Sequence, residues 1–182
     1  MSTITTYQRI LFDPLNPEID KISEIDIAHA LSLLCRAGGH FAHFYSVAQH
    51  SVNCAKEAIA RRLSRRVTLG CLLHDASEAY LSDITRPVKA HLEKYLEIEA
   101  KLQNAVYQKW LGIPTAEELA LIHEIDDTLL HHEFYAIMGE EVFSPAPTLY
   151  SKAVFEFVDF ATVEKEFLDL LATLTKDERN TV

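Results

Sequence analysis

His74 and Asp75 stand next to each other, directly after the apolar residues 69–73. A helix through this run places His74 on the same face as Val67 and Cys71, so that the imidazole points toward the interior. An unpaired Asp75 carboxylate in such surroundings costs several kcal/mol, and no Lys or Arg lies on that turn. The pair therefore indicates a bound cation. A hydrogen-bonded core histidine beside a solvated aspartate is the alternative that the local sequence leaves open.

Two further polar residues lie in apolar surroundings and can complete a metal site. His50 shares a predicted helical face with Val47 and Cys54. Asp126 lies within an apolar stretch of a long predicted helix. Two imidazoles and two carboxylates make a mixed nitrogen and oxygen site, which suits Mn, Fe, Co, Ni or Zn better than Ca.

The four residues occur in the order of a known signature. The pattern His50 … His74-Asp75 … Asp126 resembles the H…HD…D signature of the HD-domain metal-dependent phosphohydrolases, which are all-helical proteins. The resemblance covers about residues 13–135 and is strongest to the small bacterial and phage 5′-deoxynucleotidase-like subgroup. It is specific for the superfamily and its fold and much less specific for the substrate. It continues through Asp26-Ile-Ala-His-Ala-Leu-Ser, Phe44-Tyr-Ser-Val-Ala-Gln-His-Ser, Leu73-His-Asp-Ala-Ser-Glu-Ala-Tyr-Leu-Ser-Asp, Arg86-Pro-Val-Lys and Ile125-Asp-Asp-Thr-Leu-Leu-His-His-Glu.

The resemblance implies a divalent metal cation, of the Mn, Co, Ni, Fe, Zn or Mg type, as the cofactor. Its implied ligands are His50, His74, Asp75 and Asp126. Asp126 is preferred to Asp127 because only Asp126 matches the family's final aspartate. A metal lowers the pKa of a bound water to roughly 7, so the implied reaction is attack of metal-bound hydroxide on phosphorus.

Two acidic residues follow the His-Asp pair, where nucleotidases of this type keep an acidic pair near the water. Glu78 lies four residues after His74, about one helical turn on, so its carboxylate can reach the same cavity. The resemblance assigns Glu78 to orienting the water and Asp83 to protonating the leaving oxygen, and exchanged roles remain open. A solvated helix end is the alternative for both residues.

A phosphate ester also needs positive charge, which a formal net charge of −10 does not supply. Arg36 matches an arginine that precedes the first metal histidine in the resembling enzymes, and its planar guanidinium suits two phosphate oxygens. Lys89 matches a basic position close to phosphate, and Arg86 is a weaker candidate. Pairing with surface acids is the alternative for Lys89 and Arg86.

These residues together predict an enzyme, a metal-dependent phosphohydrolase that acts on a small phosphorylated metabolite. A nucleoside 5′-monophosphate is the substrate that the resemblance favours, as in a 5′-nucleotidase. A nucleoside triphosphate cut at its α-phosphate and a cyclic or linear phosphodiester are alternatives on the same site. A non-catalytic HD-fold module that binds nucleotide is the alternative from another class, and Glu78 and Asp83 argue against it.

Helices are predicted to position these residues. Capping-box signatures begin at Ser23, Ser46 and Thr115, each with Asp, Gln or Glu three residues later. The pattern predicts helices at residues 23–36, 47–63, 65–77, 88–111, 115–138 and 162–173, an irregular segment at 1–22, a structured loop at 80–88, and a short helix or irregular piece at 151–157.

Composition bounds the architecture and the partners. The chain has 182 residues, 48% of them hydrophobic, and only 5 glycines, which favours a single all-α domain. Its site-bearing core is expected at about 23–139, with a helical extension at about 150–175. The negative net charge argues against a nucleic-acid polymer as partner, and no apolar run reaches the ~20 residues of a membrane helix.

Cysteine use and the N-terminal sequence suggest a reducing compartment. Cys35, Cys54 and Cys71 are widely spaced, each in an apolar helical context, and are expected to pack as free thiols. The N-terminus lacks the charged and apolar regions of a signal peptide, so a cytoplasmic location is expected. Aromatic residues beyond the site-bearing helices fit a homodimer interface and core packing equally well.

Overall fold

The computed structural model describes residues 3–176, and it confirms the predicted all-α architecture. The ends of the predicted domain, residues 1–2 and 177–182, lie outside the described residues. The α-helices are α1 (Glu24–Leu33), α2 (Val47–Ala60), α3 (Arg65–Leu73), α4 (Glu78–Leu81), α5 (Arg86–Lys89), α6 (Glu93–Trp110), α7 (Ala116–Met138) and α8 (Phe160–Thr175). The remaining elements are the 3₁₀ turns η1 (Ile19–Lys21) and η2 (Arg36–Gly39) and an antiparallel hairpin of β1 (Ile4–Thr5) and β2 (Leu11–Phe12).

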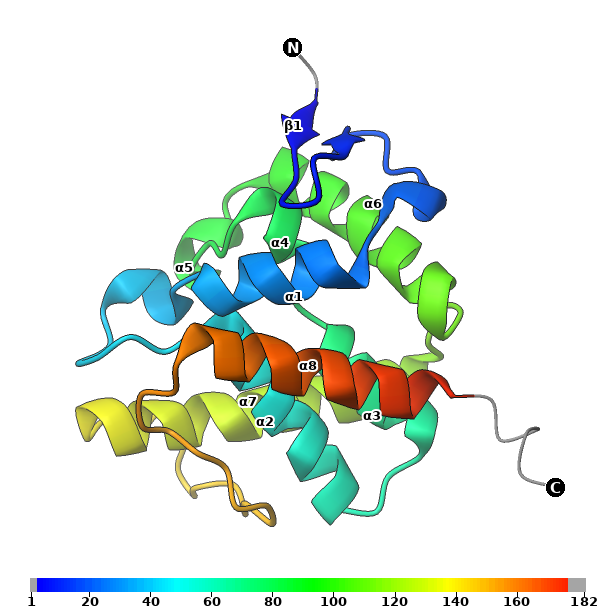
Figure 1. Cartoon of the computed structure of the whole chain (residues 1–182). Helices are drawn as coiled ribbons and strands as arrows, with labels where there is room; N and C mark the ends of the chain where they lie inside the picture. The colour runs from blue at the N-terminus through cyan, green and yellow to red at the C-terminus, as the bar shows by residue number, and fades with distance from the viewer. Residues whose placement is uncertain (1–2, 177–182) are drawn as a thin grey trace, which may run out of the picture.

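Helix α2 is central, and α1, α3, α7 and α8 all pack against it. Figure 1 shows α8, the last helix of the chain, lying across α2 and α3 and beside α1. The main core consists of buried aliphatic and aromatic side chains, among them Phe12, Ile27, Leu31, Val52, Leu72, Leu102, Val106 and Phe167. A second buried cluster joins α2, α3 and α7 through Cys54, Cys71, Ile122, Ile125 and Leu129.

Side-chain caps fix three helix starts where the sequence predicts them. The hydroxyl groups of Ser23, Ser46 and Thr115 accept hydrogen bonds from first-turn N–H groups of α1, α2 and α7. Glu118 completes a reciprocal capping box with Thr115. Asp26 is the acid of the capping-box signature at Ser23, but its carboxylate instead accepts a backbone N–H from the turn between β1 and β2 at 2.8 Å. Asp26 thereby fastens the hairpin to α1.

The helix predicted at residues 65–77 is too long, because α3 ends at Leu73. Gln103 of α6 is the physical cause. Its side-chain amide donates to the Leu73 carbonyl at 2.7 Å and accepts the Ser77 N–H at 3.0 Å. These two backbone groups would have bonded to each other in a continued helix. The His-Asp pair therefore lies on a turn after α3, and the chain changes direction there.

The loop predicted at residues 80–88 is right only for residues 82–85, because α4 covers residues 80–81 and α5 covers residues 86–88. Pro87 lies in the first turn of α5, where backbone N–H groups have no helical partner, so the proline does not prevent the helix. The helix predicted at residues 88–111 correspondingly begins later, at Glu93, as α6.

The segment predicted as irregular at residues 1–22 contains the β1–β2 hairpin and η1. Phe12 of β2 is fully buried and stacks on Tyr80, with ring centroids 4.3 Å apart. The hairpin therefore contributes to the core. Other predicted helix ends also shift. Helix α1 stops at Leu33, helix α2 stops at Ala60, and helix α8 is longer than predicted at both ends, over Phe160–Thr175.

Residues 147–157, called the strap below, cross α2 without forming a helix, which is one of the two forms predicted there. Buried polar side chains of α2 satisfy the strap backbone. The Glu57 carboxylate accepts two strap N–H groups, and Asn53 and Gln49 donate to strap carbonyl oxygens. The strap is thus held by side chains because it has no secondary structure to hold it.

No helix within residues 3–176 has both the length and the apolar character that crossing a bilayer requires. The cytoplasmic location and the homodimer stay predictions.

Replacing Phe167 by Ala should lower the free energy of unfolding by about 3–5 kcal/mol, because its ring is completely buried between α8 and the core. Phe160 on the same helix is 43% exposed, so Phe160→Ala is the matched control and should cost less than about 1 kcal/mol. Chemical denaturation measures both values. Equal, small losses would contradict the packing of α8 into the core.

Candidate metal centre

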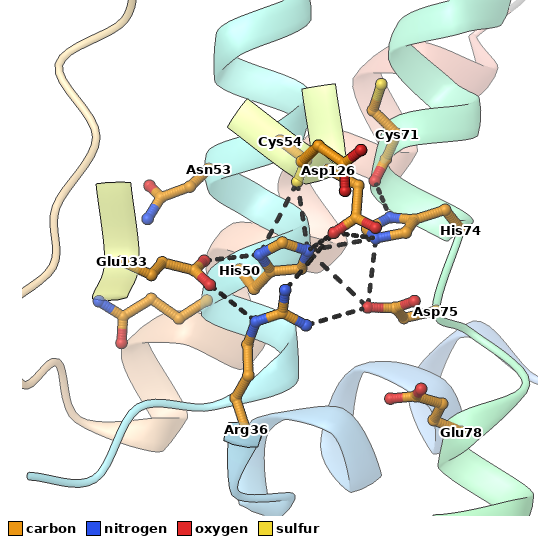
Figure 2. Close-up of polar contacts among 12 residues, drawn as sticks. Arg36, His50, Asn53, Cys54, Cys71, His74, Asp75, Glu78, Asp126 and Glu133 are labelled. Atoms are coloured by element: carbon orange, nitrogen blue, oxygen red, sulfur yellow. Dashed lines mark hydrogen bonds and ion pairs between the residues drawn. The ribbon is translucent and has the colours of Figure 1, made fainter. Parts of the chain in front are cut away.

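Two imidazoles from different helices point at each other. His50 lies near the start of α2, and His74 lies on the turn after α3. Their Nε2 atoms are 3.2 Å apart, and Figure 2 shows the two rings converging. His74 Nδ1 is 2.8 Å from the Cys71 carbonyl, to which its N–H donates. That hydrogen bond turns Nε2 of His74 toward His50.

Two carboxylates complete the group. Asp126 Oδ1 lies 3.1 Å from His50 Nε2 and 3.8 Å from His74 Nε2. Asp75 Oδ2 lies 3.2 Å from His74 Nε2 and 3.8 Å from His50 Nε2. Ligand atoms at ~2.0–2.2 Å from a first-row ion are separated from one another by ~3.0–3.6 Å. Three of these pairs, at 3.1 or 3.2 Å, match that spacing, and the two pairs at 3.8 Å lie slightly outside it, so the four side chains are candidate ligands of one ion.

The four side chains differ in how much of each is exposed to solvent. The exposed fraction is 0% for His50, 8% for His74, 14% for Asp126 and 19% for Asp75. The two carboxylates are therefore partly accessible to solvent and form the mouth of the site, while His50 is fully buried beneath them.

Cys54 also belongs to this group, although the sequence indicates only a packing role. The donor atoms of His50, Cys54 and His74 lie close enough together to hold a metal ion. The Sγ atom is 3.4 Å from His50 Nε2 and 3.9 Å from Nδ1, so it rests against the ring. Burial raises the pKa of the Cys54 thiol well above its ordinary value. The helical i, i+4 spacing from His50 is the signal that places Cys54 here.

The other two cysteines differ in their surroundings. Cys71 is buried as a free thiol, as expected. Cys35 is exposed and lies after the end of α1, so the helical, apolar context predicted for it is wrong.

Glu133, to which the sequence analysis assigns no role, is the buried acid behind His50. Its Oε1 atom lies 2.6 Å from His50 Nδ1, and its Oε2 atom accepts the Arg36 Nε–H at 2.8 Å. Burial alone would raise the pKa of Glu133, but the Arg36 and His50 charges lower it. Glu133 follows Asp126 by about two helical turns, so both lie on the same face of α7, which is the signal for finding it.

The turn around η2 brings Arg36 to the mouth of the site. The Arg36 N–H donates to the Tyr45 carbonyl and closes this loop next to the start of α2. The guanidinium Nη1 lies 3.5 Å from Asp75 Oδ2, and Nη2 lies 3.4 Å from Asp126 Oδ1. The arginine predicted to bind phosphate thus contacts both carboxylates.

Glu78, Asp83 and Lys89 lie beside this group. Figure 2 shows Glu78 near Asp75, with no hydrogen bond or ion pair to the other residues drawn. Glu78 Oε2 is buried and has no hydrogen-bond partner among the described residues. Burial and the charges of Asp75 and Asp83 raise the pKa of Glu78 to about 9. Asp83 is half-buried, and burial is the main cause that raises its pKa. Lys89 Nζ lies 3.3 Å from Glu78 and 2.7 Å from Glu99.

Arg86 pairs with two adjacent aspartates of α7. Its guanidinium lies 2.5 Å from Asp126 Oδ2 and 2.7 Å from Asp127 Oδ1. Acid pairing, the alternative to phosphate binding, is therefore found for Arg86 and also for Lys89. Only Asp126 of the two aspartates contacts the imidazoles among the described contacts.

Comparison with known proteins gives relatives without an assigned activity. No family model matches the chain. The chain is 39% identical over 116 residues to the uncharacterized protein YfdR of Escherichia coli. This aligned region covers 63% of the chain and 61% of the relative. It is 38% identical over 118 residues to an uncharacterized protein of Rhodobacter capsulatus. This aligned region covers 59% of the chain and 59% of the relative. The match thus spans less than two thirds of either relative.

Metal binding at pH 7 should release about one proton per ion, because a ligating imidazole must lose its proton. Burial alone would lower the pKa of His74, but Asp75 and Asp126 raise it well above its ordinary value. This raised pKa favours the protonated form of His74 in the metal-free protein, so metal affinity should rise with pH. Calorimetry of Zn²⁺ binding in buffers of different ionisation enthalpy counts the protons. A heat independent of the buffer would contradict this expectation.

Proposed function

We propose that the protein is a metal-dependent phosphohydrolase of the HD-domain type that acts on a small phosphorylated metabolite. The observation that carries the proposal is the spacing of four donor atoms, from His50, His74, Asp75 and Asp126, around one point at the mouth of a site. A guanidinium beside the same point supplies the positive charge that a phosphoryl group needs. The motif resemblance connects this arrangement to phosphate-ester hydrolysis.

The proposed ligands are the two Nε2 atoms and one oxygen each of Asp75 and Asp126. Two carboxylates balance the charge of a divalent ion, and imidazole with carboxylate suits Mn, Fe, Co, Ni or Zn. A bound ion of this kind would supply a low-pKa water and would polarise a phosphoryl oxygen.

Arg36 is proposed to bind the phosphoryl group. Its Nη1 and Nη2 atoms form the edge of the guanidinium that faces the mouth, and this edge matches two oxygens of a phosphate. Negative charge that builds up on those oxygens during hydrolysis would be stabilised by the fixed cation.

Glu78 and Asp83 are proposed to move protons. The buried Glu78 oxygen without a protein partner is free to accept a hydrogen bond from water, which suits a residue that orients the nucleophile. The pKa of Asp83 is raised and that of Glu78 is raised to about 9, so each holds a proton more readily than an ordinary carboxyl group, each could donate it to the leaving oxygen, and the exchanged roles stay open. Lys89 contacts Glu78 and would hold that carboxylate in place.

A nucleoside 5′-monophosphate is the proposed substrate, and this step rests on the motif resemblance. The product distinguishes it from the alternatives. Orthophosphate indicates a nucleotidase, triphosphate indicates a triphosphohydrolase, and a monophosphate released from a cyclic or linear diester indicates a phosphodiesterase. Tight nucleotide binding without any product would favour the non-catalytic module.

Purified protein supplied in turn with each divalent ion should release orthophosphate from at least one nucleoside 5′-monophosphate. Asp75→Ala and Asp126→Ala should each lower kcat/KM by more than about 1,000-fold, because each removes a proposed metal ligand. Asp127→Asn is the matched control, since it changes the adjacent carboxylate on α7, and it should retain most of the activity. Full activity of either alanine variant would refute the mechanism.

Cys54→Ser should keep both the metal and the activity, because the two aspartates supply the ligands beyond the imidazoles. The Co²⁺-loaded wild type should then lack the intense near-ultraviolet band of a cobalt–thiolate bond. Cys71→Ser controls for the change in a buried thiol. A strong band that disappears in Cys54→Ser alone would place the sulfur among the ligands and contradict the proposed set.

A further inference from the structure

Glu133 contacts both halves of the proposed site, although its side chain is completely buried on α7. Oε1 lies 2.6 Å from His50 Nδ1 and accepts the hydroxyl of Tyr45 at 3.0 Å. Oε2 accepts the Nε–H of Arg36 at 2.8 Å. Figure 2 shows its carboxylate bonded to the His50 ring and to the guanidinium, away from His74.

We propose that Glu133 is a positioning residue, whose single carboxylate orients His50 for metal binding and Arg36 for phosphate binding. The inference rests on the proposed function, because the roles of His50 and Arg36 come from it. Glu133 itself would touch neither the ion nor the phosphate. It would couple the two binding steps, since both depend on the direction of the same carboxylate.

The contact with His50 selects one form of the imidazole. An ionised carboxylate accepts hydrogen bonds and donates none, so the proton of a neutral His50 ring sits on Nδ1. The Nε2 lone pair is then free and faces His74 Nε2 at 3.2 Å. A carboxylate behind a metal-binding histidine typically changes metal affinity by about 10–100-fold.

The contact with Arg36 fixes the direction of the guanidinium. Because Nε is bonded to Glu133, the two Nη atoms face Asp75 and Asp126 at the mouth. Free rotation of an arginine side chain would otherwise spread this charge over many directions. Holding the fork in one direction favours contact with two phosphate oxygens at once.

A chain of hydrogen bonds holds Glu133 from behind. The Asn53 amide donates to the Tyr45 hydroxyl oxygen and to the Val154 carbonyl of the strap, both at 2.9 Å. The hydroxyl accepts from Asn53, so its own proton is directed to Glu133. The orientation of His50 is therefore tied through Glu133 and Tyr45 to the strap.

Glutamine is the informative replacement, because it keeps the shape of Glu133 but carries one acceptor and one donor. All three partners, His50, Tyr45 and Arg36, donate. With the amide oxygen toward His50, the amide NH₂ opposes the Arg36 Nε–H. With the amide reversed, its NH₂ group faces His50 Nδ1 and favours the tautomer that has its proton on Nε2. Nε2 then has no free lone pair for the metal. Either orientation disrupts one half of the contacts.

Glu57 provides a matched control on α2. It is equally buried and also accepts an arginine Nε–H, that of Arg61 at 2.8 Å. Its other partners in the described residues are N–H groups of the strap. Glu57→Gln therefore carries the cost of neutralising a buried carboxylate without changing the contacts of His50 or Arg36.

The test compares full-length wild type, Glu133→Gln and Glu57→Gln. Chelator competition gives the Zn²⁺ dissociation constant, calorimetry gives inorganic phosphate binding to Zn²⁺-saturated protein, and ¹⁵N chemical shifts give the His50 tautomer in metal-free protein. We expect Glu133→Gln to bind Zn²⁺ about 10–100-fold more weakly, to bind phosphate several-fold more weakly and to shift the tautomer. Glu57→Gln should match the wild type in all three.

Zn²⁺ and phosphate affinities of Glu133→Gln equal to those of Glu57→Gln would overturn the proposal. Loss of Zn²⁺ affinity alone would also overturn it, because the carboxylate would then serve only His50. If Glu133→Gln does not fold, Tyr45→Phe removes one donor and should weaken both affinities by a smaller factor, and two unchanged affinities would refute the proposal. The Zn²⁺ affinity and the His50 tautomer can be measured without turnover. A wild-type protein that hydrolyses nothing would therefore refute the proposed function, while these two measurements would still test the role of Glu133.

Discussion

Concentrated negative charge in a partly buried site is the constraint on which the rest of the molecule depends. Asp75, Asp126 and Glu133 surround His50, and one guanidinium, that of Arg36, contacts all three carboxylates. Carboxylates removed from water need matched positive charge, because leaving one unpaired costs several kcal/mol. Arg36 supplies one positive charge, Arg86 pairs with Asp126 and supplies a second, and a divalent ion would add two more. Metal binding and phosphate binding are thus two parts of one charge balance.

Helix α2 connects the charged site to the rest of the fold. Its first turns carry His50 toward α3 and α7, whereas Asn53 and Glu57 on the same helix hold the strap. The irregular strap needs these polar partners, and one of them, Asn53, also reaches the site through Tyr45. Polar residues in the middle of the bundle therefore serve both the packing of the strap and the orientation of the imidazole.

The helices could be predicted from the sequence because their signals are local. Thr115 and Glu118 form the expected capping box, and the apolar periodicity sets the core faces. The end of α3 could not be predicted, because it depends on Gln103, a side chain from another helix. The proposed metal ligands follow from a motif, and the structure brings all four into contact. Glu133 and Cys54 share helix faces with Asp126 and His50, but the sequence does not show that Glu133 meets His50 and Arg36 or that Cys54 lies beside a metal site, because tertiary packing brings these partners together.

A crystal structure of the protein grown with Mn²⁺ or Zn²⁺, with anomalous scattering recorded at the metal edge, tests the central claim most directly. The account predicts one strong anomalous peak at ~2.0–2.2 Å from Nε2 of His50 and His74 and from oxygens of Asp75 and Asp126. Glu133 should stay bonded to His50 Nδ1 and outside the coordination sphere. A peak elsewhere, or a peak bound by Cys54 with both aspartates turned away, would contradict it.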